Sequence, residues 1–402
     1  MTLVLFNTVV MVLVLAILGA RALLVGSAQA TIAIEGGPTV QVQQGTRLLR
    51  VLSDAQIPIP ASCGGRGTCG LCRVRVSGDQ GEPLATEAAQ LGTHALESGL
   101  RLACQVVVRG DLNVGLPDGL PGLQGFETRV QSIRNLTTLI KEIVLEIPES
   151  VPFTFRAGSF VQVTCPPYRL RLGDLPIDES FQSRWARMDL GDLVASCGSP
   201  TTRAYSMANH SGDASIVQLV VRLAVPPPGA PPGTPAGTVS SWLCSLRAGD
   251  PVLIAGPFGH FTATDSDLEM VFVGGGAGMA PMRSHILEQL RVLRTSRKIT
   301  FWYGARTQDD LFYVDEFDAL QREFTNFSWT AVLSDAPDSQ PASRPRGFVH
   351  DHLHDAYLAT HPSPASCEYY LCGPPLMIRA VNAMLERLAV PRAQIFFDDF
   401  GS

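Results

Sequence analysis

The pattern of charged, polar and apolar residues divides the chain into an uncharged N-terminal run and three segments of different periodicity. No residue from Thr2 to Ala20 is charged, and the stretch from Val9 to Leu18 is almost wholly aliphatic. A helix of that length spans roughly 28 Å, close to the thickness of the hydrocarbon core of a bilayer. The run therefore predicts one transmembrane helix over residues 2–24.

A cleaved signal peptide is the competing interpretation of this run, because Ser27 to Ala30 offers a cleavage site of small residues. The positively charged region that normally begins a signal peptide is missing, however, and the nearest cation, Arg21, follows the apolar run. The positive-inside rule then places the bulk of the chain on the cytoplasmic side. We favour a retained, single-pass anchor.

Residues 31–120 combine short alternating strands with one helix. Apolar side chains recur at every second position of the strands, as they do in a half-exposed sheet. The predicted elements are strands at Thr31–Glu35, Thr39–Gln43, Cys72–Ser77 and Gln105–Arg109 and a helix at Leu48–Ala55. This order predicts a small β-grasp domain, followed by a linker rich in proline and glycine.

The two remaining segments differ in their periodicity. Residues 125–262 contain β-rich runs such as Ser159–Thr164 and Ile216–Arg222, which predict an antiparallel barrel. Residues 267–402 alternate strands with amphipathic helices, beginning with the buried strand Glu269–Gly274. This alternation predicts an α/β domain with a parallel sheet.

Composition agrees with a multidomain enzyme. The 402 residues are 46% hydrophobic and 17% charged, which is enough apolar material for several cores. The net charge of -6 argues against a general nucleic-acid-binding protein, and we expect no nucleic acid among the partners.

The strongest chemical signal is a set of four cysteines, Cys63, Cys69, Cys72 and Cys104, in the spacing C-x5-C-x2-C followed by thirty-one residues and the last cysteine. The first three lie in a glycine-rich loop, in which missing side chains let the backbone approach a cluster closely. Three thiolates on a tight loop with one distant thiolate are typical ligands of a 2Fe-2S cluster. Zinc usually takes paired C-x2-C knuckles, and disulfides suit neither the odd total of nine cysteines nor a cytoplasmic domain.

The spacing of these cysteines resembles that of adrenodoxin-type ferredoxins, one residue longer in the loop than the plant type. Downstream, Arg203-Ala-Tyr205-Ser206 resembles the R-x-Y-S flavin motif of the ferredoxin-NADP reductase superfamily. The resemblance implies that Arg203 meets the flavin pyrophosphate, Tyr205 packs on the ring and Ser206 approaches flavin N5. A fixed cation, a π face and a small hydrogen-bonding group suit these tasks.

A second flavin motif follows the first. The segment from Gly237 to Ser241 resembles the superfamily's G-x-x-S, with Ser240 and Ser241 at a helix start whose N–H groups can hold a diphosphate. The alternative is an ordinary serine cap. Together the two motifs favour FAD over FMN, because a diphosphate needs the second anchor.

The third segment contains a glycine-rich turn between a strand and a helix, where backbone can approach a pyrophosphate. Its form, GGGAGMAP, resembles the superfamily's nicotinamide-dinucleotide turn and marks Gly275, Gly276, Gly278 and Pro281 as binding residues. The later Cys372-Gly373-Pro-Pro phrase ends a strand, where α/β sheets place ligands. The resemblance implies that Cys372 lies beside the nicotinamide; Cys165, Cys197, Cys244 and Cys367 are expected to be buried structural thiols.

Charge favours NADH over NADPH. Superfamily members that use NADPH commonly have a serine and an arginine where this chain has Ser334 and Asp335. A carboxylate repels a 2'-phosphate but accepts hydrogen bonds from a ribose hydroxyl. By the same resemblance, Asp398 lies near the site of hydride transfer and Phe400 covers the flavin, although Gly401 and Ser402 extend past the aromatic residue.

The order of these segments resembles the F subunits of sodium-translocating NADH:quinone oxidoreductases. The resemblance implies a transmembrane helix, a β-grasp 2Fe-2S ferredoxin domain, an antiparallel β-barrel FAD domain and an α/β NAD domain at 2–24, 31–120, 125–262 and 267–402. It also implies electron input from NADH through FAD and the cluster to other membrane subunits, in the inner (cytoplasmic) membrane of a bacterium. The catalytic candidates are Ser206, Cys372 and Asp398.

Two other functions stay open at this point. A reductase that feeds an oxygenase has the same domain order but is normally soluble, so the predicted anchor counts against it. A non-enzymatic carrier or zinc module would require both flavin motifs to be fortuitous, and absorbance of flavin and iron-sulfur would exclude it.

Overall fold

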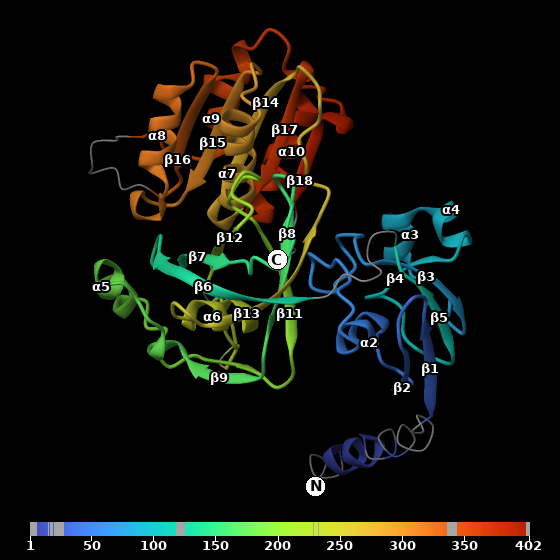
Figure 1. Cartoon of the computed structure of the whole chain (residues 1–402). Coiled ribbons are helices and arrows are strands. Elements are labelled where there is room, and N and C mark those ends of the chain that lie inside the picture. The colour runs from blue at the N-terminus through green and yellow to red at the C-terminus, as the bar shows by residue number, and fades with distance from the viewer. Residues whose placement is uncertain are drawn as a thin grey trace. The chain divides into compact units, whose positions relative to one another are not determined.

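The computed structural model describes residues 6–14, 16, 19, 28–117, 125–227, 229–231, 233–335 and 344–398. The fold divides into two compact units (Figure 1). The first comprises Met1–Ile59 and Gly65–Leu123, and the second comprises Pro60–Gly64 and Gln124–Ser402.

Only part of the predicted transmembrane segment falls on described residues. Residues 6–14 are helical, and their large apolar side chains, from Phe6 to Val14, are exposed. Residues 1–5, 15, 17, 18 and 20–27 lie outside the described part of the chain. Among the described residues, no helix has the length and apolar character needed to cross a membrane.

The first unit is a mixed sheet with a helix packed against it. Its strands run in the order β2-β1-β5-β3-β4, with β1 and β5 parallel and the other neighbours antiparallel. The buried face of α2 presents Leu48, Val51 and Leu52. The elements are β1 (Gln29–Ile34), β2 (Thr39–Gln43), α2 (Leu48–Asp54), β3 (Arg73–Gly78), α3 (Ala85–Leu91), α4 (Thr93–Glu97), β4 (Leu100–Leu102) and β5 (Leu112–Gly115). This arrangement agrees with the predicted β-grasp domain.

The predicted strand at Gln105–Arg109 is wrong, and the last strand is β5. Val106 and Val108 are buried at alternate positions, as a strand would bury them. Their backbone faces the irregular segment 45–47, to which it makes bonds such as Val108 N–H to the carbonyl of Thr46 (2.9 Å). Only a single bridge, between Arg47 and Val107, forms there, so the segment is extended without belonging to the sheet.

The second unit begins with an antiparallel barrel. Six strands lie in the order β11-β8-β13-β6-β7-β12, and a bridge between Met207 and Leu219 links its two outer edges. Helix α6 (Thr238–Ser245) buries most of its side chains against this core. The strands are β6 (Phe126–Asn135), β7 (Ile140–Glu146), β8 (Phe160–Cys165), β11 (Thr201–Ser206), β12 (Ile216–Arg222) and β13 (Pro251–Phe258).

An insertion between β8 and β11 packs onto the barrel. It contains β9 (Tyr168–Arg171), a short turn of helix at Leu172–Asp174, α5 (Glu179–Arg187) and β10 (Val194–Cys197), with β9 and β10 antiparallel. Leu172 and Ala195 are fully buried in the barrel core, so the insertion is part of that core. Helix α5 contacts the nucleotide domain through Arg184, whose Nη1 lies 2.7 Å from Asp309 Oδ2.

The rest of the second unit is a parallel sheet in the order β16-β15-β14-β17-β18, with helices on both faces (Figure 1). Successive residues of β14 face opposite sides: Met270 and Phe272 share a core with α7 and α8, whereas Val271 and Val273 share one with α9 and α10. The elements are β14 (Glu269–Gly275), α7 (Met279–Leu287), β15 (Ile299–Ala305), α8 (Val314–Glu323), β16 (Phe327–Leu333), α9 (Val349–Ala356), β17 (Cys367–Cys372), α10 (Pro375–Arg387) and β18 (Ile395–Asp398).

The barrel has its own core, but some of its residues also pack into the core on one face of the parallel sheet. Ile140, Val220 and Phe261 of the barrel lie in the same buried cluster as Phe272 of β14. At the edge of this cluster, Arg283 of α7 donates to the carbonyl of Ala208 (2.7 Å) and forms an ion pair with Glu316 of α8 (2.7 Å). These contacts hold the end of β11 beside the start of α7.

Candidate functional site

The cysteine loop has no regular secondary structure. Residues 61–72 form turns and bends between α2 and β3. Gly67 and Gly70 both have positive φ, at 83° and 65°, and a Cβ on them would lie 2.7 Å from Gln105 Nε2 and 2.9 Å from Gln90 Oε1. The left-handed backbone conformation therefore favours glycine at both positions, and the two glutamine side chains pack closely on them.

The thiols of this loop, together with Cys104, form a set that suits a metal cluster. Cys63, Cys72 and Cys104 are buried and Cys69 is partly exposed. A hydrogen bond with the Cys104 thiol and, second, burial raise the pKa of Cys72 far above its usual range. Two buried thiolates side by side need a compensating positive charge, and iron supplies it. The residues present therefore fit a 2Fe-2S cluster.

A buried ion pair holds the segment that leads to Cys104. Glu87 of α3 is fully buried and accepts hydrogen bonds from Arg101 Nε (2.9 Å), Arg101 Nη2 (2.8 Å) and the backbone N–H of Leu102 (3.0 Å). Burial by itself would raise the pKa of Glu87, but the bonds from Arg101 and the backbone lower it below its usual value. Two residues further on, Ala103 N–H donates to the carbonyl of Cys72 (2.8 Å). The fourth cysteine is thus tied to the loop and to α3.

The predicted flavin strand is β11. Arg203 is exposed on it and donates to its neighbouring carbonyl at Thr202 (2.8 Å). Tyr205 is half-buried, and burial raises its pKa, so the phenol stays protonated. Ser206 ends the strand and is buried. The exposed guanidinium of Arg203 and the partly exposed ring of Tyr205, on the same strand, fit the diphosphate and the ring of a flavin.

Strand register brings the three catalytic candidates together. Cys372 ends β17, Asp398 ends β18, and the two residues are partners in the parallel ladder. Across the domain boundary, the Ser206 hydroxyl donates to Asp398 Oδ2 at 3.4 Å. Residues 399–402, which include Phe400, lie outside the described residues. The carboxyl edge of the sheet therefore meets the end of the flavin strand.

The second flavin motif forms the start of α6. Gly237 precedes the helix, and Ser240 Oγ accepts the backbone N–H of Ala224 (3.2 Å). Ser241 Oγ is fully buried and has no hydrogen-bond partner among the described residues. The first N–H groups of the helix and this hydroxyl leave donors for a diphosphate, which fits FAD.

The glycine-rich turn lies at the carboxyl edge of the same sheet. Gly275 ends β14, and Gly276 has a φ of 56° with nothing within 4 Å of a built Cβ, so this side of the turn is open. A Cβ on Gly278 would lie 2.1 Å from the carbonyl oxygen of Cys372. Glycine at this position lets α7 begin directly against the end of β17, which Gly373 follows in the chain. Pro281 lies buried in the first turn of α7. The open turn fits a dinucleotide pyrophosphate.

Asp335 lies past the end of β16, but it is not an isolated carboxylate. Its Oδ2 accepts Arg306 Nε at 2.8 Å, and Ser334 Oγ donates to its Oδ1 at 3.1 Å. The bond from Arg306 lowers the pKa of Asp335 below its usual value. The carboxylate predicted to bind the ribose is thus paired with Arg306. The sequence did not predict this pair, because Arg306 follows a different strand, β15.

A further group of potential metal ligands lies at the amino edge of the parallel sheet. Glu269 begins β14 and Cys367 begins β17, and their ligand atoms and that of His361 lie within 4.8 Å of one another. The backbone N–H of Ser363 donates to His361 Nδ1 (3.2 Å), so the ring proton is on Nε2, 3.1 Å from Glu269 Oε2. Lys298 adds a cation 3.5 Å from the same oxygen. We interpret this group as a hydrogen-bond network, because a metal would need the Nε2 lone pair.

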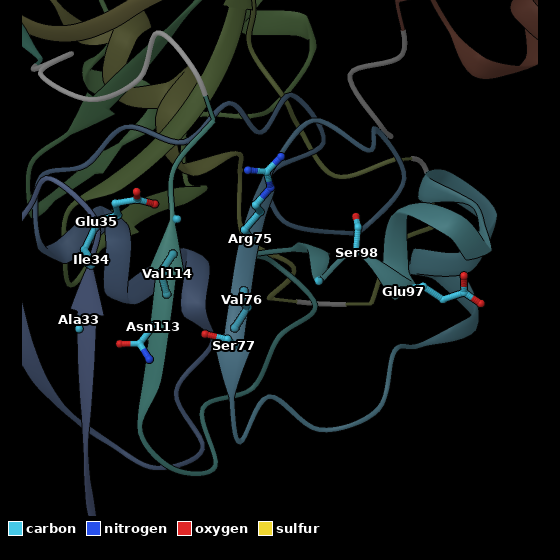
Figure 2. Close-up of a pocket in the computed structure, with 12 residues that line it drawn as sticks. Ala33, Ile34, Glu35, Arg75, Val76, Ser77, Glu97, Ser98, Asn113 and Val114 are labelled. Carbon is cyan, nitrogen blue, oxygen red and sulfur yellow. The ribbon is translucent and has the colours of Figure 1, made fainter.

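The first unit also has an open hollow of about 680 Å³ between β1, β3, β5 and the end of α4 (Figure 2). Glu35, Arg75 and Glu97 line it, and none of the four predicted ligand cysteines does. It is therefore not part of the cluster site.

Sequence analysis missed Glu87, Arg101 and Gln105. Glu87 and Arg101 are 14 positions apart in the chain, so no local pattern links them. Gln105 directly follows a predicted ligand, and this adjacency was the available signal.

Profiles of three domain families match the chain in order. The 2Fe-2S iron-sulfur cluster binding domain matches residues 32–109, the oxidoreductase FAD-binding domain 192–263 and the oxidoreductase NAD-binding domain 272–383. The chain is 44% identical over 396 residues to the F subunit of the Na(+)-translocating NADH-quinone reductase of Methylococcus capsulatus, and the match covers 98% of this chain and 97% of that protein. The chain belongs to this family of F subunits.

Other members agree with this assignment. The F subunits of Marinomonas sp. and of Neisseria meningitidis are 43% identical to this chain over 398 residues and cover 99% of it. The predicted FAD, 2Fe-2S and nicotinamide-binding domains are confirmed by the three profiles.

Solved structures show the same fold outside this family. The Amycolatopsis cytochrome P450 reductase GcoB aligns with a TM-score of 0.61 at 25% identity, covering 93% of this chain and 99% of that one. The ferredoxin reductase in carbazole 1,9a-dioxygenase aligns with a TM-score of 0.58 at 24% identity, covering 93% and 98%. Both likenesses concern the fold, which is a ferredoxin-reductase type with an N-terminal ferredoxin domain.

Proposed function

We propose that this chain is the NADH-oxidising, electron-input subunit of a sodium-pumping NADH:quinone reductase. The observation that carries the proposal is the meeting of Ser206, Cys372 and Asp398 where the flavin strand reaches the carboxyl edge of the nucleotide sheet. Membership of the family supplies the physiological role, since its members are named for NADH-quinone reduction coupled to sodium translocation.

The chemistry comes from the cofactors. When bound, FAD takes a hydride from NADH and passes electrons singly to the 2Fe-2S cluster, which accepts one at a time. In our assignment, Arg203 neutralises the flavin diphosphate and Tyr205 offers its ring face to the flavin. Gly237, Ser240 and Ser241 present the start of α6 to the same diphosphate, and the aromatic ring of Phe400 covers the flavin.

The hydride site depends on the chain's own hydrogen bonds. The Ser206 hydroxyl is oriented by Asp398 (3.4 Å), which leaves its oxygen available as an acceptor. Cys372 borders this point from the adjacent strand. We assign the nucleotide to the turn of Gly275, Gly276, Gly278 and Pro281, with Gly373 and Asp335 beside it, and the cluster to Cys63, Cys69, Cys72 and Cys104.

We also propose that the chain is anchored in the inner membrane of a bacterium by a single helix over residues 2–24, ahead of domains at 31–120, 125–262 and 267–402. The exposed apolar side chains of helix 6–14 support this, because water does not stabilise such a surface. Other membrane subunits of the complex then receive the electrons.

An anaerobic titration of the purified protein with NADH tests the electron-input role. We expect NADH to bleach the flavin absorbance and then to produce the electron paramagnetic resonance signal of a reduced 2Fe-2S cluster. A protein that binds FAD but is not reduced by NADH contradicts the proposal.

Membranes from a strain that lacks this chain should regain NADH-driven sodium uptake when the full chain is supplied, but not when residues 2–24 are deleted.

A further inference from the structure

The side chain of Gln105 lies against the fourth cluster cysteine. Its Nε2 is 3.3 Å from Cys104 Sγ, and its Oε1 is 3.4 Å from Thr86 Oγ1 of α3. Because the Thr86 hydroxyl can donate to the carbonyl oxygen of the amide, the NH₂ group is the one directed at sulfur. The amide is therefore a hydrogen-bond donor to Cys104.

The glycine loop makes room for this amide. A Cβ on Gly67 would lie 2.7 Å from Gln105 Nε2 and 2.9 Å from its Cδ, so the amide packs directly on the backbone of residue 67. Gln105 is half-buried, which restricts the water that could replace its hydrogen bond. The loop and α3 thus hold the donor in one orientation.

A second glutamine gives a close comparison within the same loop. Gln90 of α3 packs on Gly70, where a Cβ would lie 2.9 Å from its Oε1, but its Nε2 donates to the carbonyl of Thr68 (2.9 Å). Both glutamines fill the space above a glycine of the loop. The amide of Gln105 donates to a cysteine sulfur, whereas that of Gln90 donates to the backbone.

We propose that Gln105 raises the reduction potential of the 2Fe-2S cluster through its hydrogen bond to Cys104 Sγ. Reduction adds one electron and no proton to the cluster, which increases the negative charge on its sulfurs. A hydrogen bond to sulfur is then stronger in the reduced form, so it favours reduction. This inference rests on the proposed ligation of the cluster by Cys104, and it makes Gln105 a positioning residue that sets how readily the cluster takes an electron from the flavin.

The test is a potentiometric titration of the purified holoprotein, with the cluster followed by electron paramagnetic resonance. Gln105→Leu keeps the approximate size of the side chain and removes the donor. We expect the ratio of reduced to oxidised cluster at a fixed potential to fall roughly tenfold, which is a downward shift of about 59 mV for a one-electron couple. The iron and acid-labile sulfide content should equal that of the wild type, and the flavin potential should not move.

Gln90→Leu is the matched control, because it removes a glutamine that packs on the loop and donates to the backbone. An unchanged potential in Gln105→Leu, or an equal shift in Gln90→Leu, overturns the inference. If Gln105→Leu fails to assemble a cluster, Thr86→Val provides the test, because it removes the hydroxyl that holds the Gln105 amide and leaves residues 104 and 105 unaltered. A smaller downward shift of the cluster potential in Thr86→Val supports the inference, and an unchanged potential refutes it. A wild-type protein without iron would instead refute the proposed function itself.

Discussion

The loop that carries Cys69 and Cys72 contains no helix or strand, whereas Ser206, Cys372 and Asp398 are placed by strand register. In the loop, the groups that share one task lie within a few residues of one another, and glycines such as Gly67 shape the backbone around them. In the second site, the residues are up to 192 positions apart and meet because β11 and β18 end at the same place. Local spacing defines the first site, and the packed core of the domain defines the second.

Loss of one cysteine should have the largest effect, because it should remove the cluster and leave the hydride site working. We expect Cys69→Ala to abolish the 2Fe-2S cluster completely, because a cluster of this kind needs its four thiolates. FAD content and the reduction of FAD by NADH should stay near wild type, since the flavin and nucleotide residues belong to the other unit. Iron analysis and anaerobic stopped-flow absorbance measure the two properties, and a parallel loss of flavin reduction in a folded variant contradicts the separation.

The core behind the second site should make it sensitive to acid. His285 of α7 is fully buried among Phe261, Phe272 and Tyr370, and burial lowers its pKa to about 4, with the Phe261 backbone offsetting only part of the effect. Between the usual value near 6.5 and this value, the unfolded chain binds a proton that the folded chain does not. The free energy of unfolding should therefore fall as pH decreases, by roughly 2 kcal/mol at pH 5 relative to pH 7.

Unfolding of the holoprotein at both pH values, with His285→Leu beside it, measures this contribution. The variant should lose that part of the pH dependence, and substitution of the exposed His260 by leucine should keep it. Equal pH dependence in wild type and His285→Leu would exclude the buried histidine as the cause.

Removal of the residue that orients Ser206 should slow hydride transfer without removing FAD. In Asp398→Ala, we expect the rate of flavin reduction by NADH to fall roughly tenfold to a hundredfold, because a misplaced group in a hydride site costs about that much. Asp398→Asn retains an oxygen that can accept the Ser206 hydroxyl and should be affected less. Stopped-flow rates at saturating NADH measure the effect, and wild-type rates in Asp398→Ala would remove Asp398 from the site.

The smallest effect concerns the nucleotide. Asp335→Arg should raise kcat/KM for NADPH relative to NADH by about tenfold, since it replaces a repelling carboxylate by a guanidinium. Arg306→Ala should lower the use of NADPH, because it leaves Asp335 without the cation that partly neutralises it (2.8 Å). If neither variant changes the ratio, the adenosine ribose does not lie at this pair.

These two sites also explain which parts of the molecule were predictable. Three of the four ligand cysteines were proposed from their local spacing in one glycine-rich loop, and the distant Cys104 completed a pattern typical of 2Fe-2S ligands. The partner of Asp335 could not be found that way, since Arg306 reaches it from the end of a neighbouring strand. The pairing of β11, β17 and β18 is a property of the sheets, and sequence analysis reached Ser206 and Asp398 only through a resemblance to known motifs.

Errors in the predicted elements have similar causes. Gln105–Arg109 has the alternation of a strand, but its neighbour in space is the irregular segment 45–47, so no ladder forms. We predicted no separate elements at 168–200, yet this segment contributes Leu172 and Ala195 to the barrel core. Periodicity identifies which side chains are buried, but it does not identify the segment that covers them.

The buried cluster that joins barrel residues to one face of the parallel sheet has a consequence for cooperativity. Because Ile140, Val220 and Phe261 are buried together with Phe272, a chain cut near residue 265 would expose apolar surface on both fragments. The flavin and nucleotide domains should therefore unfold in one calorimetric transition rather than two. Their separate names describe cofactors, whereas we expect the shared cluster to couple their unfolding.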